Sequence, residues 1–299
     1  MKDHLVKAVA DGVRVYAAVT TDLVNEAIRR HGCHPVAAAA LGRTMTGALL
    51  LAANLKNREA LTVTFDGHGP LGKVTADATP EGFVRGYVTN PYVDLPQNAK
   101  GKIDVGGGVG TDGTVTVTRF TGLRNPVTGS APLTDGEIAD DLTKYLYVSE
   151  QTPSSVGLGV LIGHAGEEMA CIGAGGFIIQ PMPDATDETI DKLEANLKKV
   201  NSVSHMVEYG LDAKGIIAEL LQGFDVDYLT TTELAFRCPC SKERISEVLL
   251  SLGKSDLESL IKDGHAEVCC HFCNERYQFS KEELQAIYDK AMAHRQQKS

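Results

Sequence analysis

Alternating apolar and polar residues dominate the first 182 positions of the chain and predict a series of β-strands. Successive side chains of a strand point to opposite faces, so a period of two marks a strand with one buried face. The expected strands span residues 13–19, 60–65, 73–78, 83–88, 114–120, 155–162 and 170–180. Short turns separate most of them, which is typical of antiparallel sheets.

Helical patterns interrupt these strands at residues 22–30, 34–55 and 134–147. Thr21 or Asp22 can cap the first of these helices, and Gly32 follows it as a stop signal. The second is the most apolar stretch of the chain but contains Arg43, so we interpret it as a buried helix rather than a membrane span. Residues 1–182 are therefore expected to form an α+β core domain, in which helices pack on antiparallel sheets.

Residues 183–236 are strongly acidic, with 11 acidic and four basic side chains and a net charge of −7. Thr186 can cap a helix that has acidic residues in its first turn and lysines in its last, which suits the helix dipole. Its apolar residues recur at helical spacing, and a second apolar segment spans 211–224. We expect an acidic, amphipathic helical linker here. An ordinary pair of surface helices is the simplest alternative.

Residues 237–299 are predicted to form a small C-terminal domain with three short helices. The helical patterns centre on residues 245–252, 256–261 and 282–293, and the domain has 10 basic and 10 acidic residues. A domain of this size buries only a marginal core, and a bound metal is a common remedy.

Four cysteines of this domain form two close pairs. Cys238 and Cys240 flank one proline, 29 residues separate them from Cys270, and Cys270 and Cys273 complete a C-x-x-C sequence. Four convergent thiolates are what a tetrahedral zinc site needs. The thiols of each pair are also close enough to oxidise together, so the domain can hold a soft metal or lose it and form disulfides. We expect one zinc ion bound by these four cysteines.

Other side chains near the pairs leave the ligand set partly open. Cys269 could compete with its neighbour, but only Cys270 makes C-x-x-C with Cys273. His265 and His271 are further candidate ligands. Cys33 and Cys171 lie in apolar surroundings and are expected to be inert core thiols.

A permanent zinc staple that only folds the domain is the simplest interpretation of the four cysteines. Two arguments favour a switch. Zinc holds its ligands as thiolates, the form that oxidants attack, and a disulfide across one residue closes a small, strained ring that is easily reduced again. Basic residues near the pairs could temper the charge of a four-thiolate centre: Arg237, Lys242, Arg244 and Arg276.

Several familiar motifs do not fit their usual chemistry. Residues 67–72 match the dinucleotide fingerprint, but a strand pattern follows where that fingerprint needs a helix, so we expect a hairpin turn. The glycines at 106–110 likewise lack a following helix. His265 and Glu267 crowd too closely on the cysteines for a zinc deaminase site. The block Ser149-Glu150-Gln151 offers no assignable reaction, and we expect no enzyme.

Composition limits the partners and the compartment. The net charge of −10 argues against nucleic acid, because that affinity depends on Lys and Arg neutralising phosphates. The hydrophobic fraction of 43% supports a sizeable core, mostly aliphatic because tryptophan is absent. We see no signal peptide and expect the cytoplasm, where thiols stay reduced and clustered cysteines more often bind metal than form structural disulfides.

The chain resembles a known family, the redox-regulated bacterial chaperone called the 33-kDa heat-shock protein or 33-kDa chaperonin. The resemblance covers essentially the whole length and is most specific in the two cysteine pairs, at 238–241 and 270–277. Further blocks occur in the expected order at residues 67–72, 84–88, 147–151 and 175–183. The doubled cysteine at 269 and 270 departs from the family pattern and affects the expected pairing after oxidation.

This resemblance implies an ATP-independent holdase that binds unfolded or partly folded proteins. From the charge and the apolar pattern we expect neither nucleic acid nor a membrane as a partner. For the reduced form, the resemblance implies that Cys238, Cys240, Cys270 and Cys273 bind zinc and that the protein has little activity. Oxidation implies two disulfides, Cys238–Cys240 and Cys270–Cys273, together with zinc release, unfolding of the tail and linker, and homodimers. An acidic segment with an apolar stripe agrees with this logic, since it can cover an apolar face of the core until that face is needed.

Two other classes remain open from the residues. A zinc-ribbon module could bind RNA or the ribosome, although the domain lacks a basic stripe. A thiol–disulfide oxidoreductase would carry C-x-x-C at the start of a helix, whereas residues 274–279 have the pattern of a strand or loop.

Overall fold

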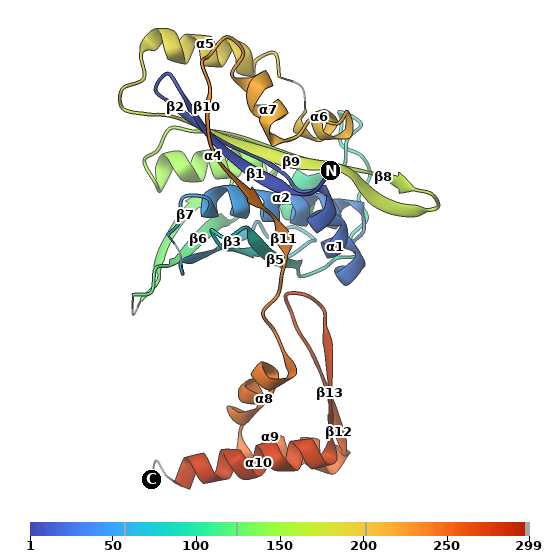
Figure 1. Cartoon of the computed structure of the whole chain (residues 1–299). Coiled ribbons are helices and arrows are strands. Elements are labelled where there is room, and N and C mark those ends of the chain that lie inside the picture. The colour runs from blue at the N-terminus through green and yellow to red at the C-terminus, as the bar shows by residue number, and fades with distance from the viewer. Residues whose placement is uncertain (57, 124, 201, 297–299) are drawn as a thin grey trace. The chain divides into compact units, whose positions relative to one another are not determined.

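The chain folds into two compact units, Met1–Arg237 and Cys238–Ser299. The computed structural model describes residues 1–56, 58–123, 125–200 and 202–296, with side chains up to residue 293. Antiparallel sheets with packed helices make up the first unit, and a two-stranded hairpin with three helices makes up the second (Figure 1). The α+β fold expected from the sequence is therefore confirmed.

A five-stranded antiparallel sheet forms one part of the first unit. Its strand order is β10-β1-β2-β9-β8. The strands are β1 (His4–Ala10), β2 (Val13–Val19), β8 (Ser155–Ala165), β9 (Glu168–Pro181) and β10 (Asp227–Glu233). Segments far apart in the sequence thus lie side by side, because β2 pairs with β9 and β1 pairs with β10.

A six-stranded sheet forms the second part, in the order β11-β5-β4-β3-β6-β7. The strands are β3 (Ala60–Asp66), β4 (Val74–Ala78), β5 (Phe83–Val88), β6 (Thr114–Phe120), β7 (Val127–Pro132) and β11 (Ala235–Phe236). All neighbours are antiparallel except β11, which runs parallel to β5. In the central strands Val63 lies opposite Ala76 and Val117, so the alternation read from the sequence places one apolar layer on one face.

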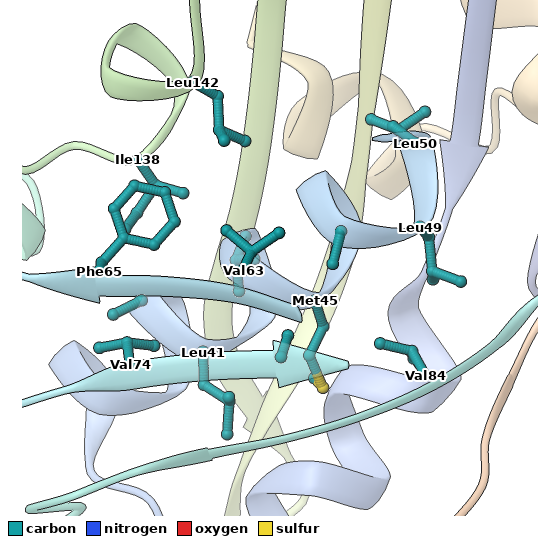
Figure 2. Close-up of a cluster of buried hydrophobic side chains, with 14 of the residues drawn as sticks. Leu41, Met45, Leu49, Leu50, Val63, Phe65, Val74, Val84, Ile138 and Leu142 are labelled. Atoms are coloured by element: carbon teal, nitrogen blue, oxygen red, sulfur yellow. The ribbon is translucent and has the colours of Figure 1, made fainter. Parts of the chain in front are cut away.

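Helix α2 (Pro35–Ala52) lies between the two sheets (Figure 1). Its side chains Leu41, Met45 and Leu49 are almost completely buried and point among the valines of the sheets (Figure 2). A helix enclosed on all sides has no polar face, which explains its mostly apolar sequence. Among the described residues it is the helix with the length and composition of a membrane span, and 89% of it is buried inside the structure.

Helix α1 (Thr21–His31) ends as expected at Gly32, which adopts a left-handed conformation with φ of 62°. Its start differs from the expectation, since Thr20 occupies the cap position and makes no side-chain capping bond. The carboxylate of Asp3 instead accepts hydrogen bonds from the backbone N–H groups of Asp22 (3.1 Å) and Leu23 (2.7 Å). The cap predicted at Thr21 or Asp22 is therefore wrong, because a residue from the N-terminus supplies it.

Three helices cover the outer face of the five-stranded sheet: α5 (Asp187–Leu197), α6 (Val203–Glu208) and α7 (Ala213–Leu220) (Figure 1). The hydroxyl of Thr186 accepts from the N–H of Thr189, so the predicted cap of α5 is confirmed. The helices and strands share a second apolar cluster, which includes Val6, Val15, Phe177, Ile179, Leu193, Met206, Val207, Ile216, Ile217 and Leu220. The apolar stripe of the acidic segment thus rests on the sheet.

The segment 183–236 is not helical throughout. Its last part forms β10, in which the β-branched residues Thr230, Thr231 and Thr232 pair with β1 at the sheet edge. The whole segment belongs to the first compact unit. Its separate role as a linker stays a prediction.

Two glycine-rich motifs pack against each other, backbone to backbone. The loop at residues 67–72 lies on the short helix α3 (Val105–Val109), with hydrogen bonds from Gly69 N to Val109 O (2.9 Å) and from Leu71 N to Gly108 O (3.0 Å). A Cβ atom on Gly69 would lie 2.4 Å from the Gly108 oxygen. The glycines therefore permit this close approach, and the prediction that no helix directly follows residues 67–72 is confirmed. The helix at 105–109 was not expected.

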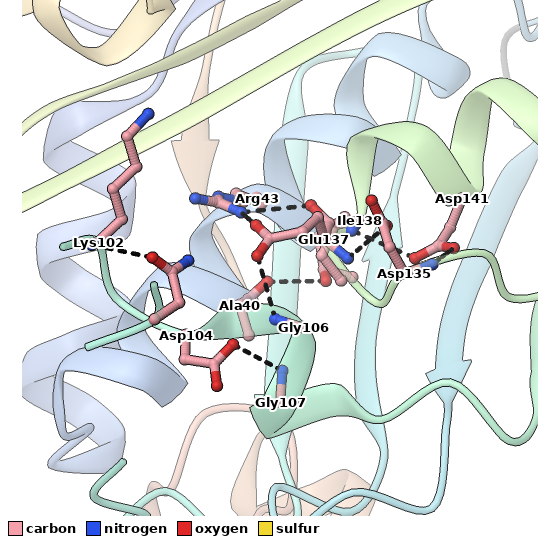
Figure 3. A network of polar contacts seen from close by, with 12 residues as sticks. Ala40, Arg43, Lys102, Asp104, Gly106, Gly107, Asp135, Glu137, Ile138 and Asp141 are labelled. Atoms are coloured by element: carbon pink, nitrogen blue, oxygen red, sulfur yellow. Dashed lines mark hydrogen bonds and ion pairs between the residues drawn. The ribbon is translucent and has the colours of Figure 1, made fainter. Parts of the chain in front are cut away.

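Helix α4 (Ala139–Val148) starts five residues later than predicted. Ile138 precedes it with φ of 74°, and the Asp141 carboxylate accepts from the N–H groups of Thr134 and Ile138 at this irregular entry (Figure 3). Nearby, Arg43 of α2 forms an ion pair of 2.6 Å with Glu137. The charge within the apolar helix is thus compensated by this loop.

The second unit contains α8 (Lys242–Leu250), α9 (Lys254–Asp263), the strands β12 (His265–Cys269) and β13 (Arg276–Ser280), and α10 (Lys281–Gln296). All three predicted helices are present. The buried apolar side chains are few: Leu249, Leu257, Ala266, Phe279, Leu284, Ile287 and Ala291. A core of this size stabilises a fold only marginally.

Truncation of α2 tests the central packing. Leu41→Ala should lower the free energy of unfolding of the first unit by about 2–5 kcal/mol, because it leaves a cavity between the sheets. Urea unfolding followed by circular dichroism in reducing buffer measures the change. Leu123→Ala is the matched control, since Leu123 is 72% exposed and its truncation should change stability by less than about 0.5 kcal/mol. Equal effects of both substitutions would contradict this packing.

Candidate metal centre

The first cysteine pair lies directly before α8. Ser241 caps this helix, with its hydroxyl accepting from the N–H of Arg244, and Arg244 Nη1 donates to the carbonyl oxygen of Pro239 at 2.9 Å. The helix start therefore fixes the turn that carries Cys238 and Cys240. Pro239 restricts its backbone further, because its ring locks φ.

The second pair lies in the turn of the β12–β13 hairpin. Cys270 N donates to Glu275 O and Asn274 N donates to Cys270 O, both at 2.8 Å. Asn274 has φ of 59°, a left-handed conformation that asparagine tolerates better than most residues. These bonds close a tight knuckle in which Cys270 and Cys273 point to the same side.

The four predicted ligands converge. The Sγ atoms of Cys238, Cys240, Cys270 and Cys273 all lie within 4.8 Å of one another. Cys238 Sγ is 3.7 Å from Cys270 Sγ, and Cys240 Sγ is 3.3 Å from Cys273 Sγ. A tetrahedron with metal–sulfur bonds of about 2.3 Å has edges of about 3.8 Å, so the arrangement fits a soft metal ion after small shifts. The four cysteines could hold a metal ion.

Burial differs among these sulfurs. Cys270 and Cys273 are 8% and 2% exposed, whereas Cys238 and Cys240 are half-buried. Burial raises the pKa of the Cys240 and Cys273 thiols above the ordinary value. A cation among the sulfurs offsets this cost, because it favours the thiolate form. Cys238 and Cys240 are thus the less buried pair of the centre.

Tyr277 is a neighbour of the centre to which the sequence analysis assigned no role. Its hydroxyl donates to Cys240 Sγ at 3.1 Å, and this bond is the main cause that raises the pKa of the tyrosine. Tyr277 stands on β13 opposite Val268. The sequence could have indicated this contact through the position of Tyr277 four residues after Cys273, because the strand that follows the turn runs back past the sulfurs.

The basic residues expected near the centre mostly have other partners. Lys242 and Arg276 form ion pairs with glutamates at 2.6 and 2.9 Å, and the Arg237 guanidinium lies over the ring of Phe83 in the first unit. Of the four, Arg244 alone bonds to a cysteine turn in the described part of the chain, through a backbone oxygen. The expectation that all four basic side chains temper the negative charge of the thiolates was therefore too broad.

The remaining candidate ligands lie outside the cluster. Among the described residues, the group of close ligating atoms contains neither His265 nor His271. Cys269 is exposed, and its thiol donates to Asn274 Oδ1 at 3.0 Å. Cys33 and Cys171 are each 3% exposed, and burial raises the pKa of both thiols to about 12, as expected for inert core residues.

The geometry also bears on reactivity. The two sulfur–sulfur distances given above join residues of different turns rather than the two members of one pair. Formation of Cys238–Cys240 and Cys270–Cys273 would therefore need local rearrangement. The C-x-x-C sequence lies between two strands, which disfavours an oxidoreductase site at a helix N-terminus.

Comparisons with known proteins agree with this arrangement. Residues 3–280 match the family described as Hsp33 protein. The 33 kDa chaperonin of Bacillus subtilis is 50% identical over 290 residues, covering 96% of this chain and 98% of that protein. The 33 kDa chaperonin of Staphylococcus carnosus is 46% identical over 295 residues, covering 98% and 99%. The crystal structure of the 33 kDa chaperonin (heat shock protein 33 homologue) of Thermotoga maritima superimposes with a TM-score of 0.89 at 35% identity, covering 98% and 99% of the chains.

An α+β unit with a covered apolar sheet, joined to a small four-cysteine unit, is thus the architecture of a class of molecular chaperones. The relatives are named chaperonins, which are not enzymes. The chain belongs to the Hsp33 family.

Proton release on metal binding tests the four-sulfur centre. Ordinary thiols have a pKa of about 8.5 and are mostly protonated at pH 7, and burial raises the pKa of Cys240 and Cys273 further. Binding of Co²⁺ or Zn²⁺ to the reduced, metal-free protein should therefore release roughly four protons per ion at pH 7. Calorimetry in buffers of different ionisation enthalpy counts them, and affinity should fall as the pH falls. Release of no protons would contradict thiolate ligation.

Proposed function

We propose that this protein is a redox-regulated, ATP-independent holdase, inactive while its cysteines hold zinc and active after they form disulfides. The convergence of four sulfurs, two of them half-buried, carries this proposal. Membership of the Hsp33 family supports the chaperone activity and supports unfolded or partly folded proteins as its partners. We expect it to protect such proteins from aggregation during oxidative and heat stress.

In the reduced state the proposed ligands of one zinc ion are Cys238, Cys240, Cys270 and Cys273. Zinc would hold these sulfurs as thiolates, and in small domains structural zinc supplies about 10–16 kcal/mol of apparent folding free energy. The first turn would then be tied to the hairpin. The few buried side chains of the second unit support this role, because they form too small a core to act alone.

Oxidation would convert each pair into a disulfide, Cys238–Cys240 and Cys270–Cys273. Two sulfurs give up two electrons to form each S–S bond, and hydrogen peroxide, taking up two protons, is reduced to two molecules of water. The half-buried Cys238 and Cys240 give the oxidant access. A disulfide sulfur is a poor zinc ligand, so zinc would leave and the second unit would unfold.

The last part of the first unit offers a route for this change to spread from the second unit. β10 forms one edge of its sheet, lies next to β1, and is largely exposed. Four residues separate the end of β10 from Cys238: Leu234, the two residues of β11 and Arg237. Unfolding of the second unit would therefore first affect β11, which pairs with β5 through two residues, and then the edge strand β10.

Loss of β10 would leave α5, α6 and α7 attached mainly through their apolar cluster with the sheet. We propose that these helices then detach and that the uncovered face, built from β1, β2 and β9, captures clients. The segment 183–236 has a net charge of −7, which would keep the detached helices solvated. An apolar face of this kind stays covered in a resting protein because it would otherwise associate.

Association and location follow from the same logic. We propose that oxidised molecules form homodimers, since uncovered apolar faces find each other as well as clients. We place the protein in the cytoplasm, where thiol systems would return it to the zinc form. The net charge of −10 and the paired charges of the second unit give no support for nucleic acid as a partner, and we propose neither nucleic acid nor a membrane as one.

Oxidation of the reduced, zinc-loaded protein tests the proposal. Hydrogen peroxide should release about one zinc per chain, seen with a chromophoric chelator, and should suppress light scattering by an aggregating client. Cys273→Ser should lose zinc beforehand and lose the response to peroxide. Cys269→Ser is the matched control, because this neighbouring thiol lies outside the cluster and its loss should leave zinc content and response unchanged.

Mass spectrometry of peptides from the oxidised protein tests the pairing. The expected bonds join cysteines within each turn, whereas bonds between the turns would follow the distances of the folded form. Zinc release without protection of the client would refute the chaperone switch. Bonds between the turns would refute only the proposed pairing.

A second test separates the covering helices from the cysteines. Gly159 and Gly173, on β8 and β9, lie directly under α6: a Cβ atom on them would lie 2.6 Å from Ser204 N and 2.4 Å from Ser204 O. Both neighbours are backbone atoms of the helix. A side chain at either glycine must therefore push α6 away from the sheet.

Gly173→Ala should accordingly give a protein that protects clients while reduced and zinc-bound, with activity at least several-fold above wild type. Light scattering measures the activity, and zinc content should stay unchanged. Gly215→Ala is the matched control on α7, where the new Cβ lies 3.3 Å or more from its neighbours and favours the helix. An inactive Gly173→Ala protein with a displaced α6 would show that this face does not bind clients.

A further inference from the structure

A cavity of about 350 Å³ lies in the first unit, on the side of the five-stranded sheet that faces α2. Strands β2, β6 and β9 and the C-terminal ends of α2 and α4 form its walls. The apolar part of its lining consists of Leu50, Leu51, Leu55, Leu146 and Ile178. The charged part consists of Arg14, Arg119 and Glu150, so the lining carries a net charge of +1 in a chain of net charge −10.

Glu150 positions one of the two arginines. Arg119 Nη2 lies 2.9 Å from Glu150 Oε2, and the hydroxyl of Tyr145 donates to Glu150 Oε1 at 2.5 Å. Both carboxylate oxygens are therefore engaged, and the carboxylate neutralises a single guanidinium. Arg119 Nε is buried and has no hydrogen-bond partner among the described residues.

A buried amide positions the second arginine. Arg14 Nε donates to Gln180 Oε1 at 2.8 Å, and Gln180 Nε2 donates to Ser154 Oγ at 2.8 Å. Gln180 is only 4% exposed, so the orientation of Arg14 is fixed from beneath. Within the described chain Arg14 has no acidic partner, and its charge is uncompensated.

We propose that this cavity is a binding site for a small aliphatic carboxylate, with its charged end towards Arg14 and Arg119 and its chain against Leu55, the partly exposed leucine of the lining. Guanidinium groups match the planar geometry of a carboxylate, and their fixed orientation lowers the entropy lost on binding. One negative charge balances the lining, whereas a dianion would also face Glu150. The site does not rest on the proposed redox switch, because its lining lies away from the covering helices.

Titration with hexanoate tests this site in the reduced, full-length protein. Hexanoate should bind with a Kd of about 1 mM or tighter and should shift the NMR signals of the Gln180 and Asn54 side-chain amides, which line the cavity. Hexanamide, which has the same shape but no charge, and hexylammonium should bind at least about tenfold more weakly. Equal binding of the three, or no binding of hexanoate up to about 10 mM, would overturn the proposal.

Variants separate recognition from stability. Arg14→Gln should weaken hexanoate binding at least about tenfold, and Arg14→Lys should retain part of it, because the charge remains without the fork. Arg29→Gln, which removes an exposed arginine of α1, is the matched control and should bind like wild type. Unchanged hexanoate affinity in a folded Arg14→Gln protein would overturn the proposed site. The proposal would also fail if Arg14→Gln and Arg29→Gln weakened hexanoate binding to the same extent. If the oxidised protein failed to protect clients, that result would contradict the proposed redox switch and would leave the carboxylate site unaffected.

Discussion

The convergence of four sulfurs from two distant turns is the constraint on which the second unit depends. One turn begins a helix and the other closes a hairpin, and each is locally fixed by its own hydrogen bonds. Their junction is different, because buried thiols side by side repel or cost desolvation once ionised and need a cation between them. A small core cannot replace that junction. Under the proposed function, the stability of this unit would therefore depend on groups whose chemistry responds to the redox state of the surroundings.

The first unit shows the opposite balance. Its five-stranded sheet has one face packed against α2 and the second sheet, and another packed against three helices of an acidic segment. The inner cluster includes bulky side chains buried on all sides, so it persists independently of the tail. The outer cluster depends on short helices that lie on glycines and that join an exposed edge strand. The proposed removal of the cover would thus leave a folded platform rather than an unfolded chain.

Local signals predicted much of the fold. Alternation located the strands around Val63, and a threonine three residues before a helical N–H located the cap of α5, because both depend on neighbours within a few residues. The cap of α1 and the charge on Arg43 could not be resolved in this way, since Asp3 and Glu137 come from far along the chain. The strand β10 was missed because its pairing with β1, not its own pattern, makes it a strand.

The amino-acid sequence by itself predicted which four sulfurs converge, because the spacing within each pair lets both thiols face one point and the family resemblance covers the whole chain. It also determined that the segment after residue 182 is acidic with an apolar stripe. Only the tertiary structure decided where that stripe rests, which glycines let α6 approach the sheet, and that Tyr277 meets Cys240. It also brought Arg14, Arg119 and Glu150 to one cavity. These contacts join residues separated by tens to hundreds of positions, and no periodicity along the chain encodes them.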